Sequence, residues 1–147
     1  MRVLVDTNIL LRSARPNHPL CSQATHAVAK LPRRNDPVFF CPQNIAEFWN
    51  VATRPTGRNG LGFSPEEALR EVASIEESLT LLPEVPAIYA AWKRIVHDYQ
   101  VQGVKVYDAR LVGVMSVYAV ESIPSFNSAD FQRYDFVTAL HPASLLA

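Results

Sequence analysis

The sequence contains few cysteines and no excess of charge of either sign. Cys21 and Cys41 are the two cysteines among 147 residues, and they form no CxxC pair. This spacing argues against a zinc knuckle or a disulfide framework and favours buried thiols in a reducing compartment. Fourteen basic and fourteen acidic side chains give a formal net charge of zero. A strongly basic nucleic-acid-binding domain is therefore excluded, and any nucleic-acid site must be local.

The sequence also lacks a long hydrophobic run. No stretch approaches the roughly 20 apolar residues that a membrane-spanning helix needs, and the apolar run at residues 2–5 is too short for a signal peptide. We therefore expect no membrane partner and a cytoplasmic location. Hydrophobic residues make up 48% of the chain, which is enough to bury a core. The length predicts a single domain over residues 1–147.

Short apolar runs alternate with helical patterns along the chain. The apolar runs predict strands at residues 2–5, 38–41, 79–82, 122–126 and 136–140. Helical spacing and helix-start signals predict helices around residues 9–11, at 20–31, 42–54, from 65 onward, at 86–101 and at 107–120, with a helical turn at 128–134. This alternation predicts a three-layer α/β/α sandwich with a central, mainly parallel sheet. Because residues 56–63 contain three glycines, we expect them to form a mobile loop over a cleft.

Three acidic residues occupy positions where chemistry is expected. Asp6 follows the first strand directly, and ligands of parallel sheets bind at the carboxyl ends of strands, although Asp6 could equally cap a helix. Glu47 lies inside a helix among apolar neighbours, but it shares one face with Asn44 and Asn50 and could be solvated. Asp108 begins an otherwise hydrophobic helix, where a carboxylate is costly unless it is paired, capping or bound to a metal.

A polar segment lies at the end of the strand predicted at residues 122–126. Ser125, Asn127, Ser128 and Asp130 place several oxygen atoms in one tight turn, although these residues could simply cap the turn or face solvent. Acids at the ends of separate elements, with no partner cations beside them in sequence, fit a Mg²⁺ or Mn²⁺ site. Two such ions can activate water and stabilise the leaving oxygen during phosphodiester cleavage.

Four segments in order resemble the signatures of the PIN domain, and most closely those of VapC toxins. They are Leu4-Val5-Asp6-Thr7-Asn8, Asn44-Ile45-Ala46-Glu47-Phe48-Trp49, Tyr107-Asp108-Ala109-Arg110-Leu111 and Ser125-Phe126-Asn127-Ser128-Ala129-Asp130-Phe131. The resemblance covers nearly the whole chain. It implies a PIN-like fold and an endoribonuclease that depends on Mg²⁺ or Mn²⁺ and leaves a 5′-phosphate and a 3′-hydroxyl.

The resemblance also assigns roles to residues. Asp6, Glu47 and Asp108 would be catalytic and would bind the metal directly or through water, with Asp130 as the fourth acid. The supporting residues would be Thr7 and Asn8 in the first turn and Ser125 and Asn127 in the last. Two positions differ from the common family pattern, which more often has Thr in place of Ser125 and Asp in place of Asn127.

Substrate and partners can also be anticipated. Arg54 and Arg58 flank the helix of Glu47 and could bind RNA phosphates, although surface arginines are often merely solvated. The resemblance implies a homodimer bound to a small antitoxin protein. The early helices carry more apolar residues than packing on a sheet requires, which predicts a surface for such a partner. These residues are Ile9, Leu10, Leu11, Leu20 and Val28.

Three other functions can be weighed against this one. A catalytically weak PIN-like module that binds RNA or protein is the main alternative, and the presence of all three main acids argues against it. A receiver-type phosphorylation switch needs clustered acids after the first strand and a late lysine, but no lysine follows Lys105. A phosphatase with an Asp-x-Asp nucleophile is excluded because Asn8 occupies the second position.

Overall fold

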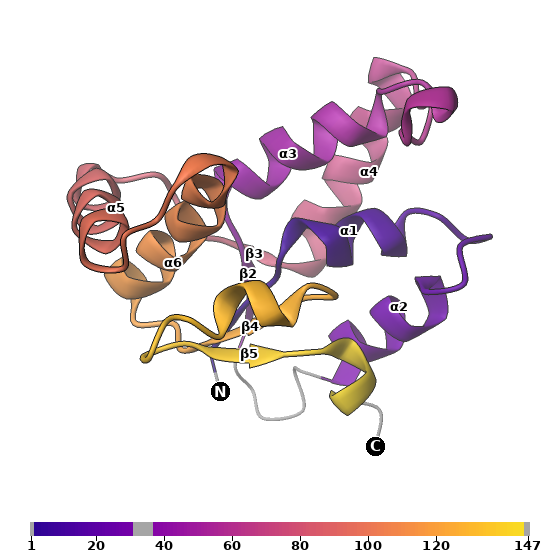
Figure 1. The fold of residues 1–147 in the computed structure, drawn as a ribbon. Coiled ribbons are helices and arrows are strands. Elements are labelled where there is room, and N and C mark those ends of the chain that lie inside the picture. Colours follow the sequence, from indigo (N-terminus) through magenta and orange to yellow (C-terminus); the bar gives the residue numbers. More distant parts are fainter. Residues whose placement is uncertain (1, 31–36, 146–147) are drawn as a thin grey trace.

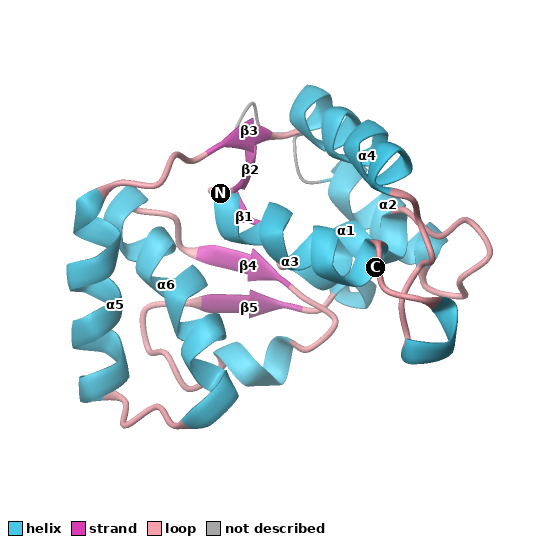
Figure 2. Ribbon diagram, turned by 90° about the horizontal axis from the view of Figure 1, so that it is seen from above, coloured by secondary structure: helices cyan, strands magenta, loops and turns pink. Residues whose placement is uncertain are grey.

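Five parallel strands form the central sheet of the computed structural model, which describes residues 2–30 and 37–145. Figure 2 shows the strands in the order β3-β2-β1-β4-β5. The strands are β1 (Val3–Leu4), β2 (Val38–Phe40), β3 (Thr80–Leu81), β4 (Ser122–Pro124) and β5 (Thr138–Leu140). Every pair is parallel, with Val3 opposite Val38 on one side and Ser122 on the other. The predicted parallel sheet is confirmed.

Helices cover both faces of this sheet. Figure 1 shows α5 and α6 packed together on one side and α1, α2 and α4 on the other. The helices are α1 (Thr7–Ser13), α2 (Cys21–Lys30), α3 (Pro42–Ala52), α4 (Pro65–Ser78), α5 (Pro86–Asp98) and α6 (Val106–Tyr118). Short 3-10 helices are η2 (Thr56–Arg58), η3 (Gly103–Lys105), η4 (Ser128–Phe131) and η5 (Pro142–Leu145). Within the described ranges, no helix is long and apolar enough to cross a membrane.

The strand residues alternate between two hydrophobic cores, as the two-residue period of a strand requires. Leu4 and Phe39 pack with the residues of α5 and α6. Val3, Val38 and Phe40 pack with α1, α3 and α4 on the other face. Because both faces of the sheet are buried, its strands are nearly continuous apolar runs, and this made them recognisable in the sequence.

Helix α6 is central and buried, as its apolar composition predicts. Residues 109 and 111–115 are all buried. A Cβ atom on Gly113 would lie 3.3 Å from the backbone nitrogen of Trp92, so this glycine lets α5 approach α6 closely. The indole Nε1 of Trp92 also donates a hydrogen bond to the carbonyl oxygen of Val106 at 2.8 Å. These contacts fix the first turn of α6, which carries Asp108.

The strand order reverses direction between β1 and β4. The chain runs from β1 outward to β2 and β3, and then returns to place β4 on the other side of β1. The backbone N–H of Asp6 donates to the carbonyl oxygen of Pro124 at 3.1 Å, so the carboxyl ends of β1 and β4 lie side by side. Ligands of open parallel sheets bind at such a switch point, because the connecting loops diverge there.

Residues 56–63 differ from the expectation of a mobile loop over a cleft. The segment forms η2 and returns to the end of α3 through backbone hydrogen bonds, including those from Leu61 N to Val51 O and from Phe63 N to Ala52 O. Gly60 is required by this close approach, since a Cβ atom there would collide with the backbone of Arg54. The glycines therefore serve packing at this point. Residues 31–36, which include the expected end of the second helix, lie outside the described residues.

Candidate active site

Asp6 lies at the carboxyl end of β1 and is the N-cap of α1. Its Oδ1 accepts a hydrogen bond from the backbone N–H of Thr7 at 2.8 Å. Its Oδ2 accepts from the hydroxyl of Ser125 at 2.6 Å. The side chain is only 9% exposed. The sequence left a capping role and a ligand role open, and the observed geometry satisfies the first without excluding the second, because each carboxylate oxygen has a further lone pair.

Ser125 joins the ends of β4 and β1 and is fully buried. Its Oγ donates to Asp6 and accepts from the Nδ2 of Asn8 at 3.2 Å and from the backbone N–H of Asn127 at 2.9 Å. The Oδ1 of Asn8 in turn accepts from the backbone N–H of Phe126 at 3.2 Å. The structure therefore brings Asn8 and Ser125 together around Asp6, whereas Asn127 contributes its backbone.

Glu47 reaches the same place from α3. Its Oε1 accepts a hydrogen bond from the hydroxyl of Thr7 at 2.9 Å. The side chain is half-buried. Of the residues that share its helix face, Asn50 is exposed but Asn44 is fully buried. This helix face is therefore solvated only at Asn50, whereas its other end, at Asn44, is buried against β1.

Asn44 is a polar residue of the site that the sequence analysis did not single out. Its Nδ2 donates to the carbonyl oxygen of Val5 and to the hydroxyl of Thr7, both at 3.1 Å. Its Oδ1 accepts from the backbone N–H of Cys41 at 2.8 Å. The detectable signal was an amide side chain three residues after a helix N-cap, which is the capping-box position. Asn44 fixes the hydroxyl that holds Glu47.

Asp108 lies in the first turn of α6, on a different element from Asp6 and Glu47. Helix α6 is tied to α3 by the side chain of Gln43, whose Nε2 donates to the carbonyl oxygen of Tyr107 at 2.8 Å. Arg110 extends this link, because its Nη1 donates to the Oε1 of Gln43 at 3.2 Å and its other arm pairs with Glu84. Asp108 itself stays partly exposed.

Asp130 lies in η4, beyond the end of β4, and has a cationic partner. Its Oδ1 is 2.9 Å from the Nζ of Lys105, the last residue of η3. The expectation that the acids have no partner cation is wrong for Asp130: Lys105 lies 25 residues before it in the chain, so sequence proximity gives no sign of this pair. A lysine one helical turn before a buried-helix acid was the available signal.

Figure 1 shows the start of α6 beside the N-terminal end of α3, and the two predicted substrate-binding arginines follow the other end of α3. Arg54 follows the C-terminal end of α3, and Arg58 ends η2. Seven residues separate Glu47 from Arg54, which corresponds to about 10 Å along a helix. The two arginines therefore lie outside the cluster of acids.

The four acids interact electrostatically. Burial, together with the negative charges of Glu47 and Asp130, raises the pKa of Asp6 to about 6, even though the hydrogen bonds from Ser125 and Thr7 oppose the shift. Burial and the charges of Asp6 and Asp130 raise the pKa of Asp108 to about 6, with Lys105 opposing. Burial and the charge of Asp108 likewise raise the pKa of Glu47. These mutual effects indicate that side chains from β1, α3, α6 and η4 converge on one region.

This donor set fits a hard divalent cation. Carboxylates and hydroxyl oxygens are the ligands that Mg²⁺ and Mn²⁺ prefer, and a bound cation would oppose both burial and the repulsion between acids, which together raise the pKa values of Asp6 and Asp108. As the side chains stand, no group of three His, Cys, Asp or Glu residues in the described ranges is arranged to hold a metal ion. A cation would therefore have to draw the acids closer together or be bound partly through water, as is usual for Mg²⁺.

The chain that carries this site matches a known protein family. The PIN domain matches residues 3–137, which is most of the chain. The chain belongs to the PIN domain family. Proteins of this family are typically nucleases and generally use divalent metal ions.

Solved structures of bacterial toxin–antitoxin proteins have the same fold. VapBC-1 from nontypeable Haemophilus influenzae aligns with a TM-score of 0.71 at 15% identity, covering 97% of this chain and 99% of that one. FitAcB from Neisseria gonorrhoeae aligns at 0.67 and 15%, covering 96% and 98%. Mycobacterium tuberculosis VapC20, described as a sarcin-ricin loop cleaving toxin, aligns at 0.63 and 19%, covering 92% and 96%. Comparison by sequence with curated proteins gives no match.

Proposed function

We propose that this protein is a Mg²⁺- or Mn²⁺-dependent endoribonuclease and the toxin of a toxin–antitoxin pair. The observation that carries the proposal is the convergence of Asp6, Glu47, Asp108 and Asp130 on the switch point of the sheet, where burial and neighbouring negative charges raise the pKa values of Asp6, Glu47 and Asp108. A protein gains nothing in stability from such repulsion, so the cluster is best explained by the cation that it would bind.

Each acid has a distinct task in this proposal. Asp6 and Asp108 would hold the cation, and Glu47 and Asp130 would contact it through water. When bound, the metal ion supplies positive charge for the phosphate and lowers the pKa of water. Ser125 and Thr7 position the carboxylates of Asp6 and Glu47, so that the acids keep their orientation before substrate arrives.

Proton transfer can be assigned to Glu47. The oxygen of a water molecule attacks the phosphorus, the water proton passes to the carboxylate of Glu47, and the bond from phosphorus to the 3′-oxygen breaks. The leaving oxygen takes a proton from solvent, which gives a 3′-hydroxyl and a 5′-phosphate. A carboxylate whose pKa is raised towards neutrality is well suited to accept a proton.

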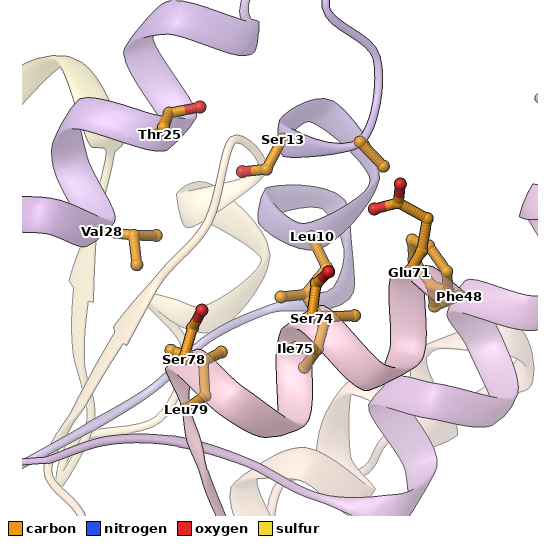
Figure 3. A pocket seen from close by; sticks show the side chains of 11 residues that line it. Leu10, Ser13, Thr25, Val28, Phe48, Glu71, Ser74, Ile75, Ser78 and Leu79 are labelled. Atoms are coloured by element: carbon orange, nitrogen blue, oxygen red, sulfur yellow. The ribbon is translucent and has the colours of Figure 1, made fainter. Parts of the chain in front are cut away.

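A protein partner is supported by an apolar groove. A cavity of about 230 Å³ lies between α1, α2 and α4, where Figure 3 shows side chains of all three helices around one space. The lining includes Leu10, Val28, Phe48 and Ile75. The sequence-based surface is corrected in part: Ile9, Leu10 and Leu11 belong to the core, while Leu20 and Val28 are half-buried. We propose that the groove receives an apolar segment of the antitoxin. We also propose that the protein is a homodimer.

The nuclease proposal is tested with purified protein freed of partner. We expect cleavage of structured RNA in Mg²⁺ or Mn²⁺, products with 5′-phosphate ends by end-labelling, and no cleavage in EDTA. The matched control is Asp135→Asn, which alters an exposed acid outside the cluster. Cleavage of equal rate in EDTA would refute metal dependence. Tight RNA binding without cleavage in either metal would instead identify a binding module.

A further inference from the structure

The ion pair between Lys105 and Asp130 changes the expected metal content of the site. The Oδ1 of Asp130 is 2.9 Å from the Nζ of Lys105. This oxygen is therefore already engaged by a cation that belongs to the protein. An ammonium group and a second divalent ion cannot both occupy the space against one carboxylate oxygen, because like charges at such distances repel strongly.

The two partners lie on turns whose backbone is fixed, while their side chains are 45% and 34% exposed. Lys105 ends η3, which begins at Gly103 with a φ of 61° and continues into α6. This left-handed conformation favours glycine and turns the chain into the helix. Asp130 lies in η4, whose last residue, Phe131, is fully buried and anchors the turn in the core. The pair is thus a link between two fixed turns.

We propose that the ammonium group of Lys105 takes the place of a second divalent cation, so that the site binds a single metal ion. This inference rests on the proposed nuclease function. Four acids from different elements make the region strongly negative, and one divalent ion plus one ammonium group neutralises three of the four charges. Asp130 then positions Lys105 through its Oδ1, in addition to its proposed contact with the ion through water, and Asp6 and Asp108 hold the single ion.

The division of labour follows from the chemistry of the two cations. An ammonium group can neutralise charge on a phosphate oxygen, but it coordinates no water and therefore activates no nucleophile. The chemistry of water activation would therefore belong to the single ion held by Asp6 and Asp108, while Lys105 would offset the charge that builds up on the phosphate. Cleavage should consequently depend on the first power of the metal concentration.

The test counts metal ions directly, with Mn²⁺ as the probe. Calorimetric titration and electron paramagnetic resonance of the full chain should give one bound Mn²⁺ per chain. Lys105→Met, which keeps the length of the side chain and removes its charge, should bind a second Mn²⁺. At low Mn²⁺ its cleavage rate should fall by roughly tenfold or more and rise with the square of the Mn²⁺ concentration. Lys105→Arg should keep one ion, and Lys93→Met, at an exposed position on α5, is the matched control.

Each outcome decides the matter. Two Mn²⁺ ions bound to the unaltered chain would overturn the single-metal proposal and leave the nuclease function standing. The single-metal proposal would also be overturned if Lys105→Met bound one Mn²⁺ ion with the same affinity as Lys93→Met. An unaltered chain that binds no Mn²⁺ and cleaves no RNA would overturn both proposals together. Circular dichroism confirms that each variant is folded before its ions are counted.

Discussion

The hydroxyl of Ser125 donates a hydrogen bond to the carboxylate of Asp6 across 2.6 Å, and thereby joins residues that are 119 positions apart in the chain. The contact links the carboxyl ends of β4 and β1, the two strands at the switch point of the sheet. It holds Asp6 in one orientation and lowers the pKa of Asp6, against the larger effect of burial. The same Oγ accepts from Asn8 and from the backbone of Asn127, so its direction is fixed.

Ser125→Ala should reduce RNA cleavage by about 10- to 100-fold, the usual cost of removing a group that orients a metal ligand. The variant should need a higher metal concentration to reach its half-maximal rate, because Asp6 would be protonated more often without the hydrogen bond from Ser125. Ser125→Thr keeps the hydroxyl and should retain more activity than the alanine variant. Cleavage by Ser125→Ala that matches the parent at every metal concentration would contradict this role.

Asp108→Asn should abolish cleavage and spare the fold. The amide keeps the shape of the carboxylate and removes one negative charge from a group of acids that repel one another. In EDTA the variant should therefore unfold at the same urea concentration as the parent or a higher one. Asp135→Asn, an exposed acid outside the group, should change neither property. An Asp108→Asn protein that fails to fold would show that Asp108 is mainly structural.

The raised pKa of Asp6 predicts how the free energy of unfolding depends on pH. Its pKa is about 6 in the folded protein against 3.8 as the ordinary value. The unfolded chain therefore loses this proton more readily, so the contribution of Asp6 is fully present below pH 3.8 and is lost as the pH rises through 6. A shift of this size corresponds to a loss of roughly 2–3 kcal/mol by pH 7.5 in EDTA.

Urea unfolding of the parent and of Asp6→Asn, at pH 5 and pH 7.5 in EDTA, isolates this contribution. The difference between the two proteins should move in favour of the variant as the pH rises, and other titrating groups such as His18 should cancel. Adding Mg²⁺ should restore stability to the parent alone. A difference that does not change with pH would show that Asp6 is not perturbed.

Asn44→Ala should destabilise the protein by about 2–3 kcal/mol, because a buried backbone N–H of Cys41 and a buried carbonyl of Val5 would lose their partner. The same change frees the hydroxyl of Thr7, which holds Glu47. Asn50→Ala, on the exposed part of the same helix, is the control and should leave stability within about 0.5 kcal/mol. Equal effects of the two substitutions would contradict the buried role of Asn44.

The strands and the main acids could be predicted from the sequence because their signals are local. Apolar runs and helix-start residues lie within a few positions of one another, and Asp6 and Asp108 stand out against apolar neighbours. The contacts of Asn44 and Lys105 with the site could not be predicted in the same way, because their partners lie on other elements. Asn44 meets β1 from α3, and Lys105 meets η4 after the chain has passed through α6 and β4.

The segment 56–63 shows a second limit of prediction from sequence, because here a local signal predicted the wrong property. Its glycines predicted mobility, since glycine adds backbone freedom when nothing constrains it. In the structure, Gly60 permits contact with the backbone of Arg54, and hydrogen bonds hold the segment to α3. Composition alone does not tell whether a glycine is present for freedom or for space.

The groove between α1, α2 and α4 predicts where an antitoxin can be uncoupled from the toxin. Ser74 is an exposed residue that lines the groove, so Ser74→Arg should place a long, charged side chain into an apolar space of about 230 Å³ and exclude an apolar segment of the partner. RNA cleavage should be unchanged, because the acids lie elsewhere on the sheet.

In cells, we expect the parent to arrest growth when expressed alone and to be rescued by co-expressing the protein encoded next to it, whereas Ser74→Arg should arrest growth in both cases. Ala73→Arg is the matched control, since it adds the same side chain at a neighbouring exposed position outside the groove. Rescue of Ser74→Arg as complete as that of Ala73→Arg would show that the partner binds elsewhere, and growth unaffected by the parent protein would contradict the toxin role itself.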